Sequence, residues 1–321
     1  SVIWYDSLMD ISVPMELLPD KYVQAFNSGD ATLMAVFFDT ATSADETMDA
    51  IRDVRAIARE NCFVTGMSAL VTDLKDLCER EEPVYVAIAV LLATLVMMLF
   101  MDSFLIPFVF LASIGMAIVW NLGSNFFLGG VSYITKALAA VLQLAVTMDY
   151  SIFLWHSYSE QKQRFAGDKN RAMAHAIAHT VTSVVGSSVT TVAGFLALCF
   201  MSFTLGRDLG IVMAKGVVLG VIGCVTTLPA MILIFDKPIE KTRHRQLLPK
   251  MDGLSRWVTK HSWVFAIAFV VILIPALFGY FNTNVYYDLG EALPEDMDYV
   301  IANSKLQEEF DMGSTHMILA D

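Results

Sequence analysis

An acidic residue lies in the middle of a long apolar segment of this chain. Asp149 follows the run ALAAVLQLAVTM and precedes YSIFLW. An ionisable side chain deep within a membrane-spanning helix is costly, and by default it marks a functional site. A low dielectric disfavours the charged carboxylate, so we expect Asp149 to bind and release a proton near physiological pH. The alternative is a structural hydrogen bond to a neighbouring helix.

Hydroxyl groups accompany this acid. Tyr150 can donate or accept a hydrogen bond. Because neighbouring helical residues point about 100° apart, Asp149 and Tyr150 should serve two different partners, or together one symmetrical pair on another helix. The segment TSVVGSSVTTVAGFLALCFM carries Ser183, Ser187, Thr190 and Thr191. Its hydroxyl-rich face could form the wall of a proton relay opposite the acid, or it could serve helix packing alone.

Other charged residues in the apolar segments suggest local roles. Lys215 is expected to extend its amine to the membrane surface rather than to neutralise a carboxylate. Arg207 and Asp208 are expected to form a local ion pair. The sequence has no CxxC, HExxH, P-loop or GxSxG pattern, so we expect no enzyme, no metal and no bound cofactor. No nucleic-acid partner is expected.

The elements that would hold these residues are apolar blocks of membrane-spanning length. Hydrophobic residues make up 56% of the 321-residue chain and charged residues 17%, where soluble domains have about a quarter charged. Each block is long enough, or nearly so, to cross about 30 Å of hydrocarbon as a helix. The blocks are 84–101, 104–120, 137–156, 181–203, 209–235 and 263–281. The sequence therefore predicts a polytopic α-helical membrane protein.

The distribution of charge predicts its orientation. Residues 1–83 carry 6 Lys/Arg against 16 Asp/Glu, and 282–321 carry 1 against 9. The connections at 157–180 and 236–262 carry 4 against 2 and 7 against 3. Basic residues concentrate in cytoplasmic loops, so 1–83 and 282–321 should be extracytoplasmic in a multi-pass protein of the cell membrane.

The first acidic segment is expected to be a small α+β domain. Residues 31–39 predict a strand, and Cys62–Thr65 a second short one. Ser43 to Glu46 has the spacing of a capping box that opens a helix. A further amphipathic helix over about 68–82 should lead into the first apolar block.

Three segments together resemble MMPL-type transporters of the resistance-nodulation-division (RND) superfamily. GGVSYITKALAAVLQLAVTMDYSIFL is similar to the family's fourth transmembrane helix, with its Asp-Tyr pair. SSVTTVAGFLAL is similar to the fifth, and DLGIVMAKGVVLGVIGCVTTLPAMIL to the sixth. The resemblance implies a duplicated twelve-helix protein with extracytoplasmic porter domains, of which this chain is a fragment.

The resemblance also implies the domain boundaries. They are 1–83 as the C-terminal part of the first porter domain, 84–235 as helices 2–6, 236–262 as a basic cytoplasmic linker, 263–281 as helix 7 and 282–321 as the start of the second porter domain. The partner of this half would be helices 8–12, with a matching Asp-Tyr pair on the tenth helix.

The function that the resemblance implies is export of lipids or other amphiphilic molecules, driven by the proton gradient through Asp149 and Tyr150. Membrane lipids and a homo-oligomer are further expected partners. The alternative is a lipid- or sterol-sensing scaffold that binds hydrophobic molecules without pumping them.

Overall fold

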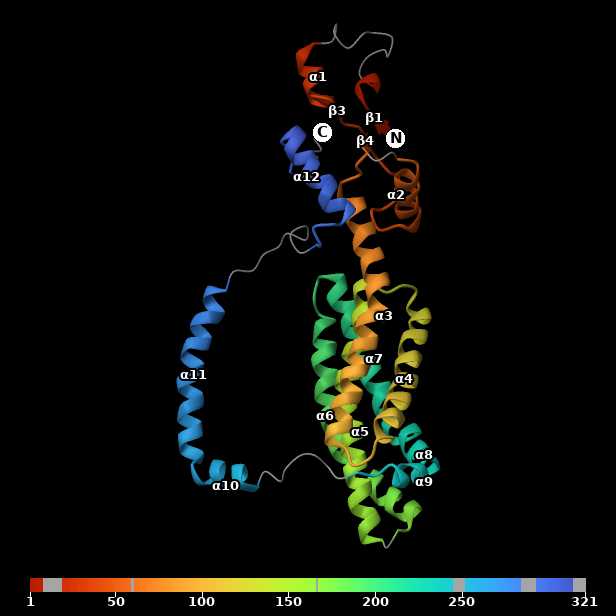
Figure 1. The fold of residues 1–321 in the computed structure, drawn as a ribbon, viewed down its shortest axis with the longest axis vertical. Coiled ribbons are helices and arrows are strands. Elements are labelled where there is room, and N and C mark those ends of the chain that lie inside the picture. Colours follow the sequence, from red (N-terminus) through yellow and green to blue (C-terminus); the bar gives the residue numbers. More distant parts are fainter. Residues whose placement is uncertain (8–18, 59–60, 166, 245–251, 284–292, 314–321) are drawn as a thin grey trace. The chain divides into compact units, whose positions relative to one another are not determined.

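Six helices in the described part of the chain are long and apolar enough to cross a membrane. The computed structural model describes residues 1–7, 19–58, 61–165, 167–244, 252–283 and 293–313. The spans are α3 (Met67–Phe100), α4 (Ile106–Gly123) with the 3-10 helix η3 (Ser124–Leu128), α5 (Tyr133–Arg164), α6 (Lys169–Leu198), α7 (Thr204–Val225) with α8 (Thr227–Ile234), and α11 (Ser262–Asn282). Each contains most or all of one predicted apolar block, so the prediction of a multi-pass helical membrane protein is confirmed (Figure 1).

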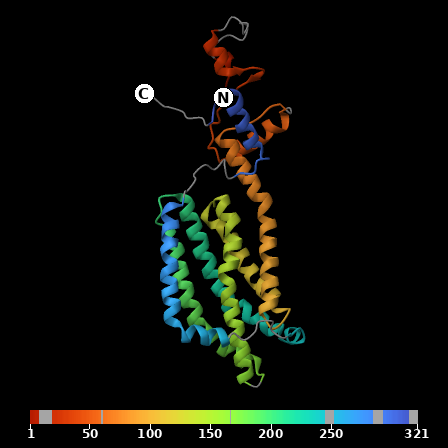
Figure 2. The ribbon, with the colours of Figure 1, turned by 60° about the vertical axis from the view of Figure 1, so that its left-hand side comes forward.

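The chain divides into two units, which are Ser1–Leu77 with Leu277–Asp321, and Cys78–Ala276. In the second unit, α5, α6 and α7 pack on one another, and α4 packs on α5 and α7. Figure 2 shows these helices running side by side as a bundle. Two short helices, α9 (Asp236–Lys241) and α10 (Asp252–Lys260), follow α8.

Glycines on α7 allow the helices of the bundle to approach closely. A Cβ atom at Gly220 would lie 2.2 Å from Thr147 Cγ2, and one at Gly216 would lie 2.6 Å from Asn121 Nδ2. Because lipid is as apolar as the helices, small residues that permit close backbone contact are a main source of helix association in membranes. The contacts of α7 with α4 and α5 therefore depend on these two glycines.

Two spans leave most of their surface uncovered. Every residue of α11 is exposed, and only 6% of the apolar window of α3 is buried. The end of α3 nevertheless contributes Met97 to the core of the bundle. No described element covers α11.

The first unit contains short helices and two small antiparallel ladders. β1 (Val2–Ile3) pairs with β4 (Ala35–Val36), and β2 (Asn27–Ser28) pairs with β3 (Ala31–Thr32). The helices are η1 (Tyr5–Ser7), α1 (Asp20–Phe26), α2 (Asp45–Ile57) and α12 (Asp298–Phe310).

Three local predictions for this unit are wrong. The strand expected over 31–39 is reduced to two pairs of residues in different ladders, and 62–65 forms no strand. These residues favour extended backbone but have no long neighbouring strand with which to form a ladder. The cap of α2 is Ala44, without a side-chain hydrogen bond, so Ser43 does not form the expected capping box.

A buried carboxylate joins two distant parts of this unit. Asp73, on α3, is 7% exposed and pairs with both terminal nitrogens of Arg55. The same carboxylate accepts a hydrogen bond of 2.9 Å from the backbone N–H of Tyr299 in the first turn of α12. The first-turn N–H groups of a helix lack partners within it, so Asp73 caps α12 and fixes it beside α3.

Adding a methyl group at Gly220 should destabilise the bundle, because its Cβ would collide with Thr147. Over-packing of this kind costs about 1–3 kcal/mol, so Gly220→Ala should lower the thermal unfolding midpoint of the purified protein. Gly223→Ala is the matched control, since its Cβ would meet only Ala117 Cβ at 3.7 Å. Combining Gly220→Ala with Thr147→Ala should restore part of the loss. Equal midpoints for the two single glycine variants would contradict this account of the α5–α7 contact.

Candidate functional site

The acid Asp149 lies near the midpoint of α5, on a face that no described element covers. The exposed residues of this face recur at steps of three and four, with the acid at the centre. They are Leu138, Leu142, Ala145, Asp149, Phe153, His156 and Glu160. These steps average about 3.7 residues, close to the 3.6 residues of one helical turn, so the seven side chains lie along one face of α5. We refer to these seven residues as the α5 stripe, and their spacing suits coverage by another helix.

Within the described residues, the Asp149 side chain has no hydrogen bond and no ion pair. A bare carboxylate facing hydrocarbon is strongly unfavourable. A side chain of this kind at mid-membrane depth therefore requires a partner that the described residues do not supply.

Tyr150 occupies the other face of α5. It is 4% exposed and belongs to the same core cluster as Leu154 and Tyr158. The two members of the Asp-Tyr pair thus face different surroundings, the acid on the uncovered stripe and the phenol inside the bundle.

The hydroxyl residues of α6 lie at the level of the acid. Ser157 Oγ donates to the carbonyl of Ala176 over 3.5 Å, and because α5 and α6 are antiparallel, the level of Asp149 on α5 corresponds to about residue 184 on α6. Ser183 and Ser187 flank that level, and both are exposed.

Three of the four predicted hydroxyl residues of α6 form hydrogen bonds within their own helix. Ser187 donates to Val184 O over 3.1 Å, while Thr190 and Thr191 donate to Ser187 O over 2.7 and 3.0 Å. Thr190 is exposed and Thr191 is half-buried. No hydrogen bond joins Asp149 to this group among the residues that the structure describes.

Lys215 extends its amine toward η3, at one end of the bundle. Its amine donates to the backbone carbonyl of Asn121 over 3.0 Å and to Asn125 Oδ1 over 2.5 Å. These acceptors lie at the C-terminal end of α4 and in η3, where carbonyl groups lack helical partners and a cation is favourable. The lysine thus binds a helix end and no carboxylate in the described structure.

A buried amide network next to this lysine was not identified from the sequence. Asn121 Nδ2 donates to Gln143 Oε1 over 2.8 Å, and Gln143 Nε2 donates to the carbonyl of Gly216 over 3.1 Å. Asn121 Oδ1 is buried without a partner in the described structure. The network joins α4, α5 and α7 on the face of α5 opposite the stripe. The sequence does place Asn121 and Gln143 within or directly beside apolar segments, and these two amides could have indicated a buried network.

A polar pocket of about 160 Å³ opens beside α9. It lies at the end of the bundle where the chain turns from α5 into α6. On one side, Asp102 accepts a hydrogen bond from Trp155 Nε1 over 3.0 Å and pairs with Arg243 over 2.9 Å. The backbone N–H of His244 donates to Asp102 O over 2.9 Å. This carboxylate therefore connects the α3–α4 loop to α5 and to the segment after α9.

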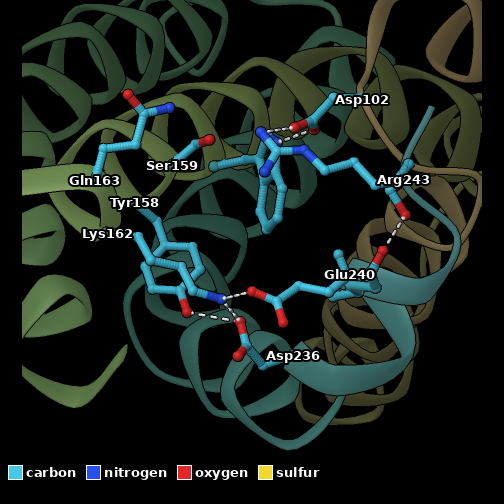
Figure 3. Close-up of a pocket in the computed structure, with 11 residues that line it drawn as sticks. Asp102, Tyr158, Ser159, Lys162, Gln163, Asp236, Glu240 and Arg243 are labelled. Carbon is cyan, nitrogen blue, oxygen red and sulfur yellow. Dashed lines mark hydrogen bonds and ion pairs between the residues drawn. The ribbon is translucent and has the colours of Figure 1, made fainter. Parts of the chain in front are cut away.

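The other side of this pocket is a cluster of four titratable residues. Lys162 Nζ lies 2.7 Å from both Asp236 Oδ1 and Glu240 Oε1, and the Tyr158 hydroxyl donates to Asp236 over 2.8 Å. Figure 3 shows Lys162 between the two carboxylates, with Tyr158 on the same oxygen of Asp236. The cluster fixes α9 against α5. Sequence reasoning missed it because its members are far apart in the chain.

Across the described ranges, no three His, Cys, Asp or Glu side chains are grouped so as to hold a metal ion. The arrangement offers instead an uncovered acid on a spanning helix, a buried amide network and a charged cluster at one end.

The chain is similar to several known membrane and transport proteins. Relatives include putative membrane protein MJ1562 of Methanocaldococcus jannaschii, 25% identical over 243 residues that cover 73% of this chain and 62% of that protein. Probable transport protein MmpL12 of Mycobacterium tuberculosis is 24% identical over 95% of this chain and 27% of its own length. Siderophore exporter MmpL5 of the same species is 27% identical over 73% and 25%. The chain thus spans less than two thirds of each of these relatives.

The six apolar spans and the helical bundle define a multi-pass membrane protein. The sequence profile of the MMPL family matches residues 14–274, which is most of the chain. The chain belongs to the MMPL family, and the resemblance identified from the three apolar segments is confirmed.

Removing the Lys162 amine should destabilise the bundle, because Asp236 is 10% exposed and would keep its charge without a cation. Loss of a hydrogen-bonded partner from a buried charge costs about 1–3 kcal/mol, so Lys162→Met should lower the unfolding midpoint clearly. Arg164→Met is the matched control. It removes an exposed ion pair with Glu160, four residues earlier on α5. Such pairs contribute only about 0.3–0.5 kcal/mol to stability. Similar losses for both variants would contradict a structural role for the cluster.

Proposed function

We propose that the protein is a secondary active transporter that exports lipids or other amphiphilic molecules and is driven by protons that bind Asp149. The observation that carries this proposal is the position of Asp149 at the centre of the α5 stripe of a membrane-spanning helix, where its carboxyl has no partner among the described residues. Membership of the MMPL family supports it. The names of MmpL12 and MmpL5, a transport protein and a siderophore exporter, support transport rather than catalysis.

Proton binding would change how α5 packs. A protonated carboxyl is neutral and can lie in an apolar contact, whereas a carboxylate there requires water, a cation or strong hydrogen-bond donors. Each proton that binds or leaves would therefore favour a different arrangement of the α5 stripe against the helix that covers it.

The opposite face of α5 would carry this change into the bundle. Gln143 bonds to Asn121 and to the Gly216 carbonyl, and Thr147 lies directly against Gly220. At its far end, Lys162 holds α9. A shift of α5 would thus displace α4, α7 and α9 with it, because their polar contacts cannot be left unpaired cheaply.

The proposed covering element is the second repeat of the protein, helices 8–12, with a matching Asp-Tyr pair. Residues 1–83 and 282–321 would be parts of extracytoplasmic porter domains, and the substrate would leave through them. Tyr150, and hydroxyls such as Ser183, Ser187, Thr190 and Thr191, would assist proton passage. Membrane lipids and further copies of the protein are proposed partners.

Replacing Asp149 by asparagine should abolish proton-coupled transport without unfolding the protein, since the amide keeps the size of the carboxyl but cannot titrate. The full-length protein would be reconstituted in vesicles with enclosed pyranine and a fluorescent phospholipid. An imposed pH gradient should drive proton entry and lipid movement in the native protein, and neither in Asp149→Asn. Glu160→Gln is the matched control, because Glu160 lies on the same stripe but near the helix end. Native rates in Asp149→Asn would exclude the proton role.

Collapsing the proton gradient distinguishes an exporter from a sensing scaffold. A protonophore should stop movement of the fluorescent phospholipid by the reconstituted full-length protein. A scaffold would show lipid binding that is unchanged by the protonophore and no movement at any pH gradient.

A further inference from the structure

The end of the bundle that carries η3 has a second pocket, of about 310 Å³. It lies between the α4–α5 connection and the start of α7. Its lining residues are Leu128, Gly130, Val131, Arg207, Asp208, Ile211 and Val212. Pockets that bind small molecules have volumes from about 300 Å³ upward, so this one suits a head group and the first part of an attached chain.

The apolar wall of this pocket is held by core packing. Val212 is fully buried and belongs to a core cluster with Ala139 and Met213. Val131 packs against the same cluster. Gly129, next to the pocket, has a φ of 80°, a left-handed conformation that favours glycine and turns the chain away from η3. The wall is therefore a fixed surface rather than a group of free side chains.

Two opposite charges line the same pocket. Arg207 is exposed and Asp208 is half-buried. The ion pair that the sequence predicts between them is not formed, and within the described ranges neither side chain has a hydrogen bond or an ion pair. The pocket thus presents a free guanidinium and a free carboxylate next to an apolar wall.

Exposed aromatic side chains surround this end of the bundle. Phe126 and Phe127 on η3 are each 85% exposed, and Phe200 and Phe203 on the α6–α7 turn are 91% and 62% exposed. These phenylalanines lie where candidate membrane spans end or begin, and exposed apolar side chains at the edge of the hydrocarbon region suit contact with lipid. The pocket therefore lies at the depth of lipid head groups.

We propose that this pocket binds a zwitterionic phospholipid with a primary ammonium group. The phosphate would pair with the Arg207 guanidinium, whose planar donors match phosphate oxygens. The ammonium would donate to the Asp208 carboxylate, and the glycerol and first methylene groups would lie against Val131 and Ile211. This proposal does not require that the protein transports anything.

The pair of charges also predicts selectivity. An anionic phosphatidylglycerol would satisfy Arg207 but would leave Asp208 without a cation, next to added negative charge. A phosphatidylcholine has a quaternary ammonium, which cannot donate a hydrogen bond to the carboxylate. The expected order of retention is phosphatidylethanolamine first, with the other two clearly weaker.

Native mass spectrometry of the full-length protein with an equal mixture of the three phospholipids tests this order. Arg207→Gln should lower bound phosphatidylethanolamine by about tenfold, since it removes charge-assisted hydrogen bonds. Asp208→Asn should lower phosphatidylethanolamine but not phosphatidylglycerol, so the preference should disappear. Val131→Trp should block the pocket without changing its charge.

Controls distinguish this site from lipid bound around the protein. Lys136→Gln removes an exposed cation at the same end, outside the pocket, and should bind lipid like the native protein. Asp149→Asn should also retain the lipid, so that lost transport in that variant leaves this proposal intact. Unfolding midpoints identify variants that have not folded, and a folded Arg207→Lys, which keeps the charge, should retain more lipid than Arg207→Gln. Native-like retention by Arg207→Gln, equal loss in Lys136→Gln, or a preference for phosphatidylglycerol would overturn the proposal.

Discussion

Polar groups inside hydrocarbon must find partners within the protein, and α5 meets this requirement on one face only. On the bundle side, Gln143 is hydrogen-bonded to α4 and α7, and Thr147 donates to the carbonyl of Gln143 while its methyl group fills the space left by Gly220. On the other side, Asp149 is left without a partner in the described structure. One face of α5 therefore packs tightly in the bundle, against the glycines of α7 and the amide of Asn121. The opposite face, the α5 stripe, has no such contacts in the described structure.

The parts of the fold that depend on local composition could be predicted from the sequence. A helix that crosses a membrane needs about twenty apolar residues and makes its backbone hydrogen bonds within itself. All six spans were therefore predicted, and the family was identified from the segment around Asp149. The strand expected over 31–39 was wrong because a strand is completed by its neighbour, and the sequence does not reveal which neighbour is present.

The contacts that join distant residues could not be predicted. Lys162 and Asp236 are 74 positions apart, and each looks like an ordinary charge at a helix end. For Arg207 and Asp208, closeness in the sequence led to a wrong prediction of an ion pair. They are adjacent in sequence, but adjacent helical residues point about 100° apart, and both line a pocket instead of pairing. The α6 hydroxyls were correctly placed on a helix, yet Ser187, Thr190 and Thr191 donate their hydrogen bonds to its own backbone.

The engagement of Lys215 has an electrical consequence. Its amine is bound by Asn121 and Asn125 at a helix end, so it does not balance an ionised Asp149. Because Asp149 lies near the midpoint of its helix, in the proposed mechanism a proton that reaches it from either side of a membrane would cross about half of the transmembrane voltage. One elementary charge moving through 100 mV is worth about 2.3 kcal/mol, so about 1 kcal/mol acts on each such proton. Occupancy of this carboxyl would then follow the membrane voltage even when both sides are equally acidic.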